Sequence, residues 1–319
     1  MQETKVFSSS GDVLADRRYE LARAYRGDGD LPAAIELLEQ AVELRPDFIA
    51  AWFDLGDARE IAGQRDGAIA AFQEALKSDP SDRHGAGLRL RLLDIGGHAM
   101  SPDYVRSVFD QYARRFDEAL AGLSYNAPQM LADGVARVCE AQQRPVRFAN
   151  MLDLGCGTGL SGSVFRPAVE FMEGIDLSPG MIEQARRKNI YDQLEVGDLT
   201  ESLDRHLRND LRYDLIVAAD VFVYCADLTL IAELTAQLLT TDGLFAFTVE
   251  THAHDGVILG PKLRYAHGEK HVRDTLASAH LTPYVLAQVS TRMESDQPVP
   301  GLLVIAGRAL HPPLSEAIG

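Results

Sequence analysis

The apolar positions of the chain follow two different patterns, one in the first 80 residues and another after residue 100. In the first part, small and apolar residues recur at an offset of 34 positions, and a proline closes each period. Small residues let two antiparallel helices approach closely while larger apolar residues fill between them, so this period predicts a helical repeat. The matched pairs include Leu21 with Leu55, Ala34 with Ala68, Leu38 with Phe72, and Pro46 with Pro80.

After residue 100, short apolar runs alternate with segments of helical spacing. The run at 213–220 is nearly continuous in apolar residues, which is typical of a central strand that helices cover on both faces. The pattern therefore predicts an α/β domain with a largely parallel sheet. We expect strands near 148–152, 171–176, 194–197, 213–220, 244–249, 284–289 and 302–306, and helices near 101–120, 128–140, 179–188, 227–239 and 270–279.

The first of these strands leads into a glycine bend. Asp153 ends the strand, and Gly155, Gly157 and Gly159 alternate after it. Glycine takes positive φ and has no Cβ, so such a bend lets a ligand lie against backbone N–H groups at a helix N-terminus. Residues 157–162 also satisfy the G-x-G-x-x-G dinucleotide fingerprint, but the Asp153 carboxylate repels a pyrophosphate and accepts a bond from a cationic amine.

Two further acids end neighbouring strands. Asp176 follows Asp153 by 23 residues, and Asp198 closes the run at 194–197. In their order and spacing, these three motifs resemble class I S-adenosylmethionine-dependent methyltransferases of the type 11/12 kind. The resemblance implies a Rossmann-like seven-stranded sheet in the order 3-2-1-4-5-7-6. It also implies S-adenosylmethionine as the methyl donor and S-adenosylhomocysteine as the product.

The resemblance also implies a set of cofactor contacts. Asp176 would accept bonds from the ribose hydroxyls and Asp198 from the adenine amino group. The aromatic residues at 109–117 resemble a segment that covers the cofactor in small-molecule methyltransferases, although helical spacing there equally fits core packing. The predicted cofactor-binding residues are Tyr112, Phe116, Asp153, Gly155, Gly157, Asp176, Leu177, Met181, Asp198, Leu199 and Asp220.

The acceptor is expected beside the end of the fourth strand, where residues 220–225 follow the apolar run. Tyr224, His252 and His267 are the catalytic candidates. His252 is a candidate general base, and His267 either caps the helix at 270–279 or faces the pocket. Tyr125, on the loop after residue 120, is a weaker candidate than Tyr112 and Phe116 for lining the site. His252 and His254 lie next to an acid, but two spaced ligands are a weak metal signal, and we predict no metal site.

The repeat period and its residues are similar to tetratricopeptide repeats. Two repeats bury less than the three or so that a solenoid needs, and residues 88–93 supply a further helix. The glycines and proline at 96–102 predict a linker. We therefore expect a helical repeat domain at 1–97 and a methyltransferase domain at 98–319. The repeats offer a surface for a peptide or protein, or act as a lid or assembly surface.

Composition narrows the function. The net charge of −16 argues against nucleic acid as a partner. Three scattered cysteines and no leader or membrane-spanning run favour a cytoplasmic protein. The sequence predicts a methyltransferase for a small-molecule acceptor. The alternatives are a protein methyltransferase whose repeats recruit the target and a non-catalytic interaction module. A nicotinamide oxidoreductase is a poorer fit, since no Lys or Tyr base signature is visible.

Overall fold

The computed structural model describes residues 9–96, 99–294 and 296–308. The chain divides into two compact units, one ending at Val108 and the other beginning at Phe109. This division falls within a helix, α6 (Pro102–Tyr112), some residues beyond the linker expected at 96–102. Positions 97 and 98 of that linker lie outside the described residues, so the domain boundary stays a prediction.

The first unit is a run of antiparallel helix pairs, as the repeat period predicts. Gly56 shows why small residues recur: a Cβ there would lie 2.6 Å from the ring of Phe72. The prolines at the period ends follow the second helix of each pair. The helices are α1 (Val13–Gly27), α2 (Leu31–Leu44), α3 (Ile49–Ile61), α4 (Arg65–Ser78) and α5 (Ala86–Leu92).

The second unit is built on a mixed sheet whose main path runs β3-β2-β1-β4-β5-β11-β8. In chain order among the seven predicted strands this is 3-2-1-4-5-7-6, so the predicted fold class is confirmed. The strand β11 is antiparallel to both of its neighbours. The strands are β1 (Phe148–Leu154), β2 (Val169–Asp176), β3 (Gln193–Val196), β4 (Tyr213–Ala218), β5 (Leu239–Glu250), β6 (Val257–Leu259), β7 (Tyr265–His267), β8 (Thr282–Val289), β9 (Met293–Glu294), β10 (Gln297–Pro298) and β11 (Gly301–Gly307).

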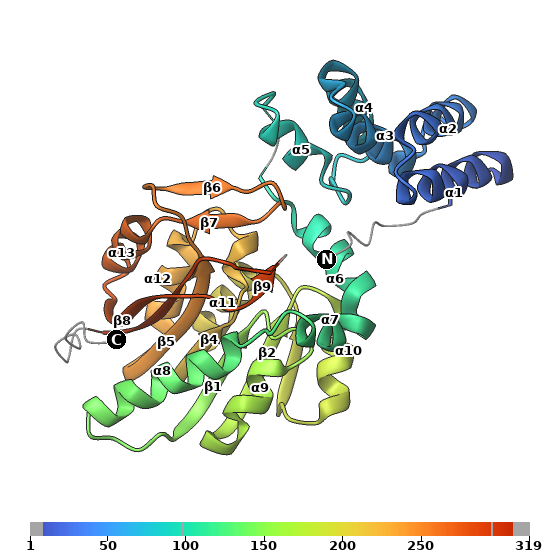
Figure 1. Ribbon diagram of the computed structural model, residues 1–319. Coiled ribbons are helices and arrows are strands. Elements are labelled where there is room, and N and C mark those ends of the chain that lie inside the picture. The colour runs from blue at the N-terminus through green and yellow to red at the C-terminus, as the bar shows by residue number, and fades with distance from the viewer. Residues whose placement is uncertain (1–8, 97–98, 295, 309–319) are drawn as a thin grey trace. The chain divides into compact units, whose positions relative to one another are not determined.

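Helices cover both faces of this sheet. Figure 1 shows α8 and α9 in front of it and α11 and α12 behind it, and each side has its own cluster of buried apolar side chains. The helices are α7 (Phe116–Ala121), α8 (Ala127–Ala141), α9 (Leu160–Phe165), α10 (Pro179–Lys188), α11 (Leu199–Arg208), α12 (Thr229–Leu238) and α13 (Glu269–Ser278), with 3₁₀ turns η1 (Ala113–Arg115), η2 (Arg166–Ala168) and η3 (Phe222–Tyr224).

Three local predictions need correction. The helix expected at 101–120 is broken into α6, η1 and α7. The strand expected at 244–249 begins earlier, at Leu239, directly after α12, and its pairing with β4 has an irregularity between Tyr213 and Leu215. The short strands β6, β7, β9 and β10 were not predicted, since two or three residues are too few to show a period. Among the described residues, no helix is both long and apolar enough to cross a bilayer.

Candidate functional site

The glycine bend lies where the sequence places it, between β1 and α9. Gly155 has a φ of +60° and Gly157 a φ of +55°, a region that L side chains rarely adopt. A Cβ on Gly155 would lie 2.6 Å from Val221, whereas the nearest atom to a Cβ on Gly157 is 3.9 Å away, on the Phe116 ring. The bend therefore keeps open backbone beside Gly157, on the carboxyl edge of the parallel strands.

Asp176 joins the end of β2 to this bend. Its Oδ2 accepts the Gly157 N–H at 2.9 Å, and its Oδ1 accepts the Ser178 N–H at 2.8 Å. Burial raises the pKa of this carboxyl to about 6, and the two backbone bonds oppose that rise. Each carboxylate oxygen has a further lone pair, so the group holds the bend and can still accept bonds from a ligand.

Asp153 is almost fully enclosed at the end of β1. The Tyr191 hydroxyl donates to its Oδ2 at 2.6 Å. Burial raises the pKa of Asp153 to about 7, and the nearby Asp176 charge adds to the rise. Such a carboxyl gains from a cation at its side, because a positive charge offsets the cost of desolvation. Tyr191 was missed from the sequence, since it stands in a connection without periodicity.

The end of α6 from Phe109, with η1 and α7, covers the bend. Phe116 places its ring over Gly157, and Asp117 bonds to the Thr158 hydroxyl and pairs with Lys188 at 2.7 Å. Asp110 accepts the Gly180 N–H at 2.9 Å at the start of α10. Tyr112 is half-buried at the end of α6. The segment that the sequence marks as aromatic therefore lies at the glycine bend, although contact of Tyr112 and Phe116 with a cofactor remains a prediction.

The predicted adenine neighbours stand at the starts of α10 and α11. Met181 is fully buried, whereas Leu177 and Leu199 are half-buried. Asp198 is the N-cap of α11, where its Oδ1 accepts the N–H groups of Thr200 and Glu201. Its capping role leaves Oδ2 as the atom for the predicted adenine bond.

Asp220 has a different setting from the one expected. It follows β4 with a φ of +55°. Its carboxylate accepts from Thr248 Oγ1 at 2.8 Å, Thr291 Oγ1 at 3.0 Å and Arg292 at 2.7 Å. The side chain predicted to face the cofactor is thus engaged by three side chains from β5 and from the connection after β8.

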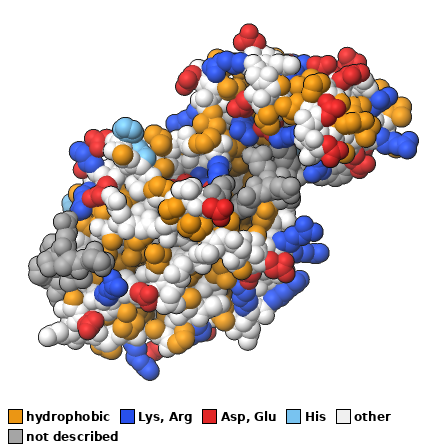
Figure 2. Space-filling model, viewed as in Figure 1, with side chains coloured by type: hydrophobic (Ala, Val, Ile, Leu, Met, Phe, Trp, Pro, Cys, Tyr) orange, Lys and Arg blue, Asp and Glu red, His pale blue; other side chains and the backbone are white. Residues whose placement is uncertain are grey.

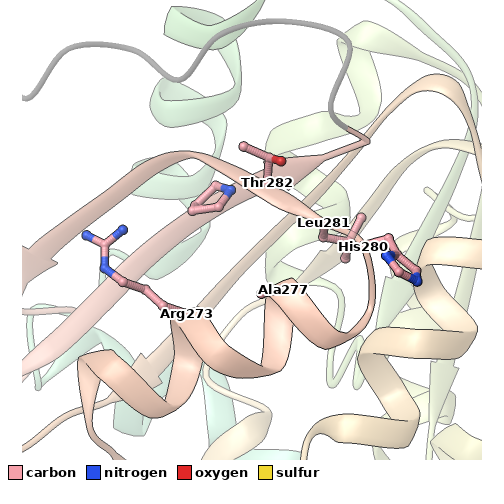
Figure 3. A pocket seen from close by; sticks show the side chains of 6 residues that line it. Arg273, Ala277, His280, Leu281 and Thr282 are labelled. Carbon is pink, nitrogen blue, oxygen red and sulfur yellow. The ribbon is translucent and has the colours of Figure 1, made fainter.

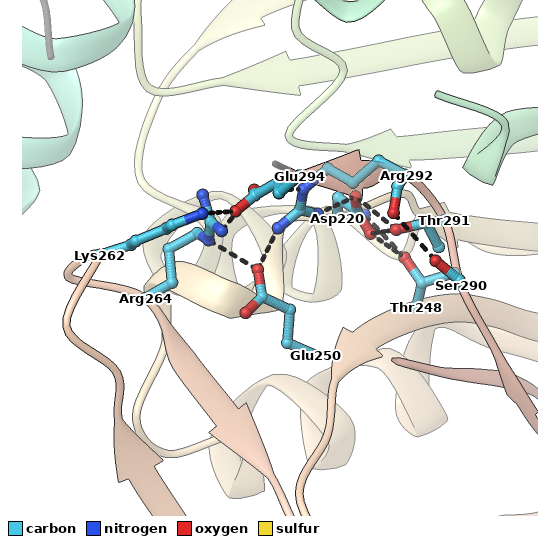
Figure 4. A network of polar contacts seen from close by, with 9 residues as sticks. All are labelled: Asp220, Thr248, Glu250, Lys262, Arg264, Ser290, Thr291, Arg292 and Glu294. Carbon is cyan, nitrogen blue, oxygen red and sulfur yellow. Dashed lines mark hydrogen bonds and ion pairs between the residues drawn. The ribbon is translucent and has the colours of Figure 1, made fainter. Parts of the chain in front are cut away.

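Asp220 is one member of a larger ionic network (Figure 4). Arg292, with 6% of its side chain exposed, also pairs with Glu250 and with Glu294, and Arg264 pairs with the same two glutamates. Three positive side chains, counting Lys262, face three carboxylates, so the network carries no surplus charge. Sequence reasoning missed it because its members come from four separate segments.

Aromatic side chains lie near this network. The Phe109 ring packs edge-on against Tyr224, with centroids 5.1 Å apart. Burial raises the pKa of the Tyr224 hydroxyl. Burial also raises the pKa of the Tyr125 hydroxyl well above its usual value, and the negative charges of Asp220 and Asp153 add to that rise. Both hydroxyls are therefore protonated at neutral pH and able to donate to an acceptor.

The two histidines among the catalytic candidates lie beside backbone carbonyls. His252 Nε2 lies 3.2 Å from the Gly256 carbonyl, and its Nδ1 accepts the His254 N–H at 3.3 Å. His267 is fully buried, its Nε2 lies 3.2 Å from the Phe222 carbonyl, and burial lowers its pKa to about 4. A group with so low a pKa is a weak base at neutral pH. Base catalysis by either residue stays a prediction.

A cavity of about 410 Å³ lies apart from the glycine bend, at the end of α13 and the start of β8 (Figure 3). Thr282, in the wall of this cavity, pairs with Gly307 of β11, and Gly307 pairs with Leu244 of β5. Leu244 lies near the beginning of the part of β5 that is parallel to β4. The glycine bend follows the carboxyl end of β1. The cavity is therefore at the opposite edge of the sheet, away from the catalytic candidates.

A parallel sheet closed by an antiparallel strand, with a glycine bend after β1 and acids at the carboxyl ends of β1 and β2, defines a methyltransferase-type Rossmann-like domain. Residues 152–245 match the family model of a methyltransferase domain, and residues 19–83 match that of a tetratricopeptide repeat. The resemblance found in the sequence is thus confirmed: the chain joins tetratricopeptide repeats to a methyltransferase domain.

Three similar proteins illustrate the match. Methyltransferase-like protein 27 of Homo sapiens is 35% identical over 101 residues, 31% of this chain and 40% of that protein. Malonyl-[acyl-carrier protein] O-methyltransferase of Serratia marcescens is 25% identical over 168 residues, which are 53% of this chain and 60% of that protein. The matches thus span less than two thirds of these relatives. An S-adenosylmethionine-dependent methyltransferase structure from Clostridium acetobutylicum covers 63% of this chain and 98% of its own, at 16% identity and a TM-score of 0.47.

Proposed function

We propose that the chain is an S-adenosylmethionine-dependent methyltransferase that acts on a small-molecule acceptor. The observation that carries this proposal is the glycine bend flanked by two buried carboxyls, Asp153 and Asp176. Burial raises the pKa of both, so both favour a ligand that brings a positive charge or hydrogen-bond donors. A sulfonium nucleoside with an amino group and two ribose hydroxyls offers these features.

The residues fit this donor. Gly157, where a Cβ would meet no atom closer than 3.9 Å, lets the donor approach the backbone, and Asp176 accepts from the ribose hydroxyls. Asp153 faces the amino group, and Asp198 with the half-buried Leu177 and Leu199 surrounds the adenine. When bound, the donor supplies a methyl group already activated by cationic sulfur. The protein's own task is then to align the acceptor and to exclude water, which the cover formed by α6 and α7 serves.

The acceptor side favours a small molecule. Tyr224, Tyr125 and Phe109 provide an aromatic setting with protonated hydroxyls, as small-ligand sites often do. Figure 2 shows Lys and Arg side chains near the end of α10. Most of this charge is compensated, because Arg186 and Arg187 share Glu183 and Lys188 pairs with Asp117. With a net charge of −16, this basic cluster is a poor match for a polyanion.

A second candidate is transfer to a protein-borne acceptor that the repeats recruit. It is favoured by the tetratricopeptide match at residues 19–83, a class of repeat whose concave surface binds peptides. The name of the Serratia relative points the same way, because its acceptor is attached to a carrier protein. In this version the methyl donor and its site are unchanged.

The test is methyl transfer from radiolabelled S-adenosylmethionine by the full chain, with a metabolite pool and a peptide pool assayed separately. We expect label in the metabolite pool and saturable binding of S-adenosylhomocysteine by calorimetry. Label confined to the peptide pool would favour the second candidate. Absence of nucleoside binding to the folded chain would contradict both.

A further inference from the structure

Three ligand-type side chains converge on the face of the sheet that α11 covers, away from the glycine bend. Glu173 comes from β2, Glu195 from β3 and His206 from α11. Glu173 and His206 are 2% and 3% exposed, whereas Glu195 keeps 21% of its side chain exposed. One atom from each residue lies within 4.8 Å of the other two. Buried groups of this kind need a partner, because an isolated charge is costly away from water.

Each of the three residues uses its other polar atom in a bond outside the centre. The Tyr213 hydroxyl lies 2.9 Å from His206 Nδ1 and donates to Glu173 Oε2 at 2.8 Å. Glu195 Oε1 accepts from Ser202 and Arg205. Outer bonds that fix the second atom of each ligand are typical of metal sites. They leave Glu173 Oε1, Glu195 Oε2 and His206 Nε2 directed at one another.

The tautomer of the His206 imidazole depends on where the Tyr213 proton goes. If the Tyr213 proton goes to Glu173, its oxygen accepts the Nδ1–H of His206, and Nε2 then carries a lone pair. That lone pair faces two carboxylate oxygens, each 3.5 Å away. Glu173 Oε1 is buried and has no hydrogen-bond partner. Three acceptors facing one another repel unless a cation lies between them.

The distances favour a metal ion over a proton. At 3.5 Å, Nε2 is farther from both oxygens than the about 2.7–3.2 Å of a normal N–H···O bond. Ligands about 2.1 Å from a tetrahedral zinc ion stand about 3.4 Å from one another. We propose that Glu173, Glu195 and His206 bind a zinc ion, with water from the exposed side of Glu195 as the fourth ligand.

The ion would be structural. It would tie α11 to β2 and β3, because each of these three elements supplies one ligand. The ligand Glu195 lies three residues before Asp198, the N-cap of α11. The site is independent of the proposed methyl transfer, because no ligand belongs to the glycine bend. It is also separate from the His252–His254 loop considered in the sequence.

The test uses the full chain, stripped with chelator and titrated with zinc chloride in a calorimeter. We expect one zinc per chain and a higher melting temperature with zinc than without it. Glu173→Gln and Glu195→Gln should weaken zinc binding about tenfold or more, and Tyr213→Phe, which keeps all three ligands, about 10–100-fold. Glu195 is partly exposed, so its variant is the one expected to fold in every case.

Two controls match these variants. Glu170→Gln changes an exposed acid on the same strand β2, and His254→Gln removes a histidine from the exposed loop. Both should bind zinc as the wild type does. A folded wild-type chain that takes up no zinc would overturn the proposal. So would equal zinc affinity in Glu195→Gln and Glu170→Gln, or loss of the bound zinc in His254→Gln.

Discussion

Asp176 has two tasks at once, since the carboxylate that holds Gly157 is the one we propose for the ribose. Asp176→Ala should weaken binding of S-adenosylmethionine by about tenfold or more, because hydrogen bonds to a charged group contribute about 1.5–3 kcal/mol. Isothermal calorimetry measures the affinity, with Glu170→Gln as the control on the same strand. Unchanged affinity in a folded variant would remove Asp176 from the site.

Asp153 should give opposite pH trends for stability and for ligand affinity. Its pKa is about 7 in the folded chain and about 3.9 when unfolded, so the folded state holds an extra proton between these values. This group's contribution to stability therefore falls as the pH rises from 4 to 7. Asp153→Asn, which cannot titrate, should raise the melting temperature relative to wild type more at pH 8 than at pH 5.

The same variant should bind S-adenosylmethionine more weakly than wild type at pH 8, where the native carboxyl is charged. The two affinities should converge towards pH 5, where it is protonated. Melting curves and calorimetry at both values check these statements. A loss of affinity that is constant with pH would argue that Asp153 acts by shape alone.

Among single residues, the sequence identified those whose roles depend on the local backbone. Asp153, Gly155, Gly157 and Asp176 were placed by their position at strand ends, and the structure brings them together. Tyr191 and Arg292 could not be found this way, because each reaches its partner from another segment. Asp220 shows both cases: its predicted contact with the cofactor stays a prediction, and its bond to Arg292 comes from another segment and could not be found from the sequence.

The α6–η1–α7 element should act as a cover. Phe116 is half-buried and its ring lies at the open side of Gly157. Phe116→Ala and Tyr112→Ala should therefore lower cofactor retention and activity several-fold while leaving the melting temperature of the ligand-free chain nearly unchanged. Thermal melts and activity assays on the same preparations separate the possibilities. A large drop in melting temperature would show that these rings are core residues.

The pairing of α3 and α4 depends on a missing side chain. Gly56→Ala should destabilise the repeats by about 1–3 kcal/mol, because its Cβ would lie 2.6 Å from the buried Phe72 ring. Gly27→Ala is the matched control, since nothing lies within 4 Å of a Cβ at that helical glycine. It should be neutral or slightly stabilising. Equal melting curves for the two variants would contradict close packing of Gly56 against Phe72.

Long periodic elements were predicted well, and short ones were not. The repeat helices and the seven main strands follow from a period that repeats along many residues, and their order matches the family resemblance. The break in α6–η1–α7 and the irregularity in β5 depend on contacts with other elements, which no local period records. The strands β9 and β10 pair only with each other over two residues.

At the scale of the whole chain, the two compact units differ in what they can bind, because every proposed contact with the nucleoside comes from residues after Phe109. Calorimetric melting of the full chain should therefore show two transitions. S-adenosylhomocysteine at a hundred times its Kd should stabilise one of them by about 2.7 kcal/mol and leave the other in place. Gly56→Ala identifies the transition of the repeats, since it should lower that one alone. If the ligand moves both transitions together, the repeats and the methyltransferase domain unfold as a single cooperative unit, and recruitment by the repeats would then be coupled to occupancy of the donor site.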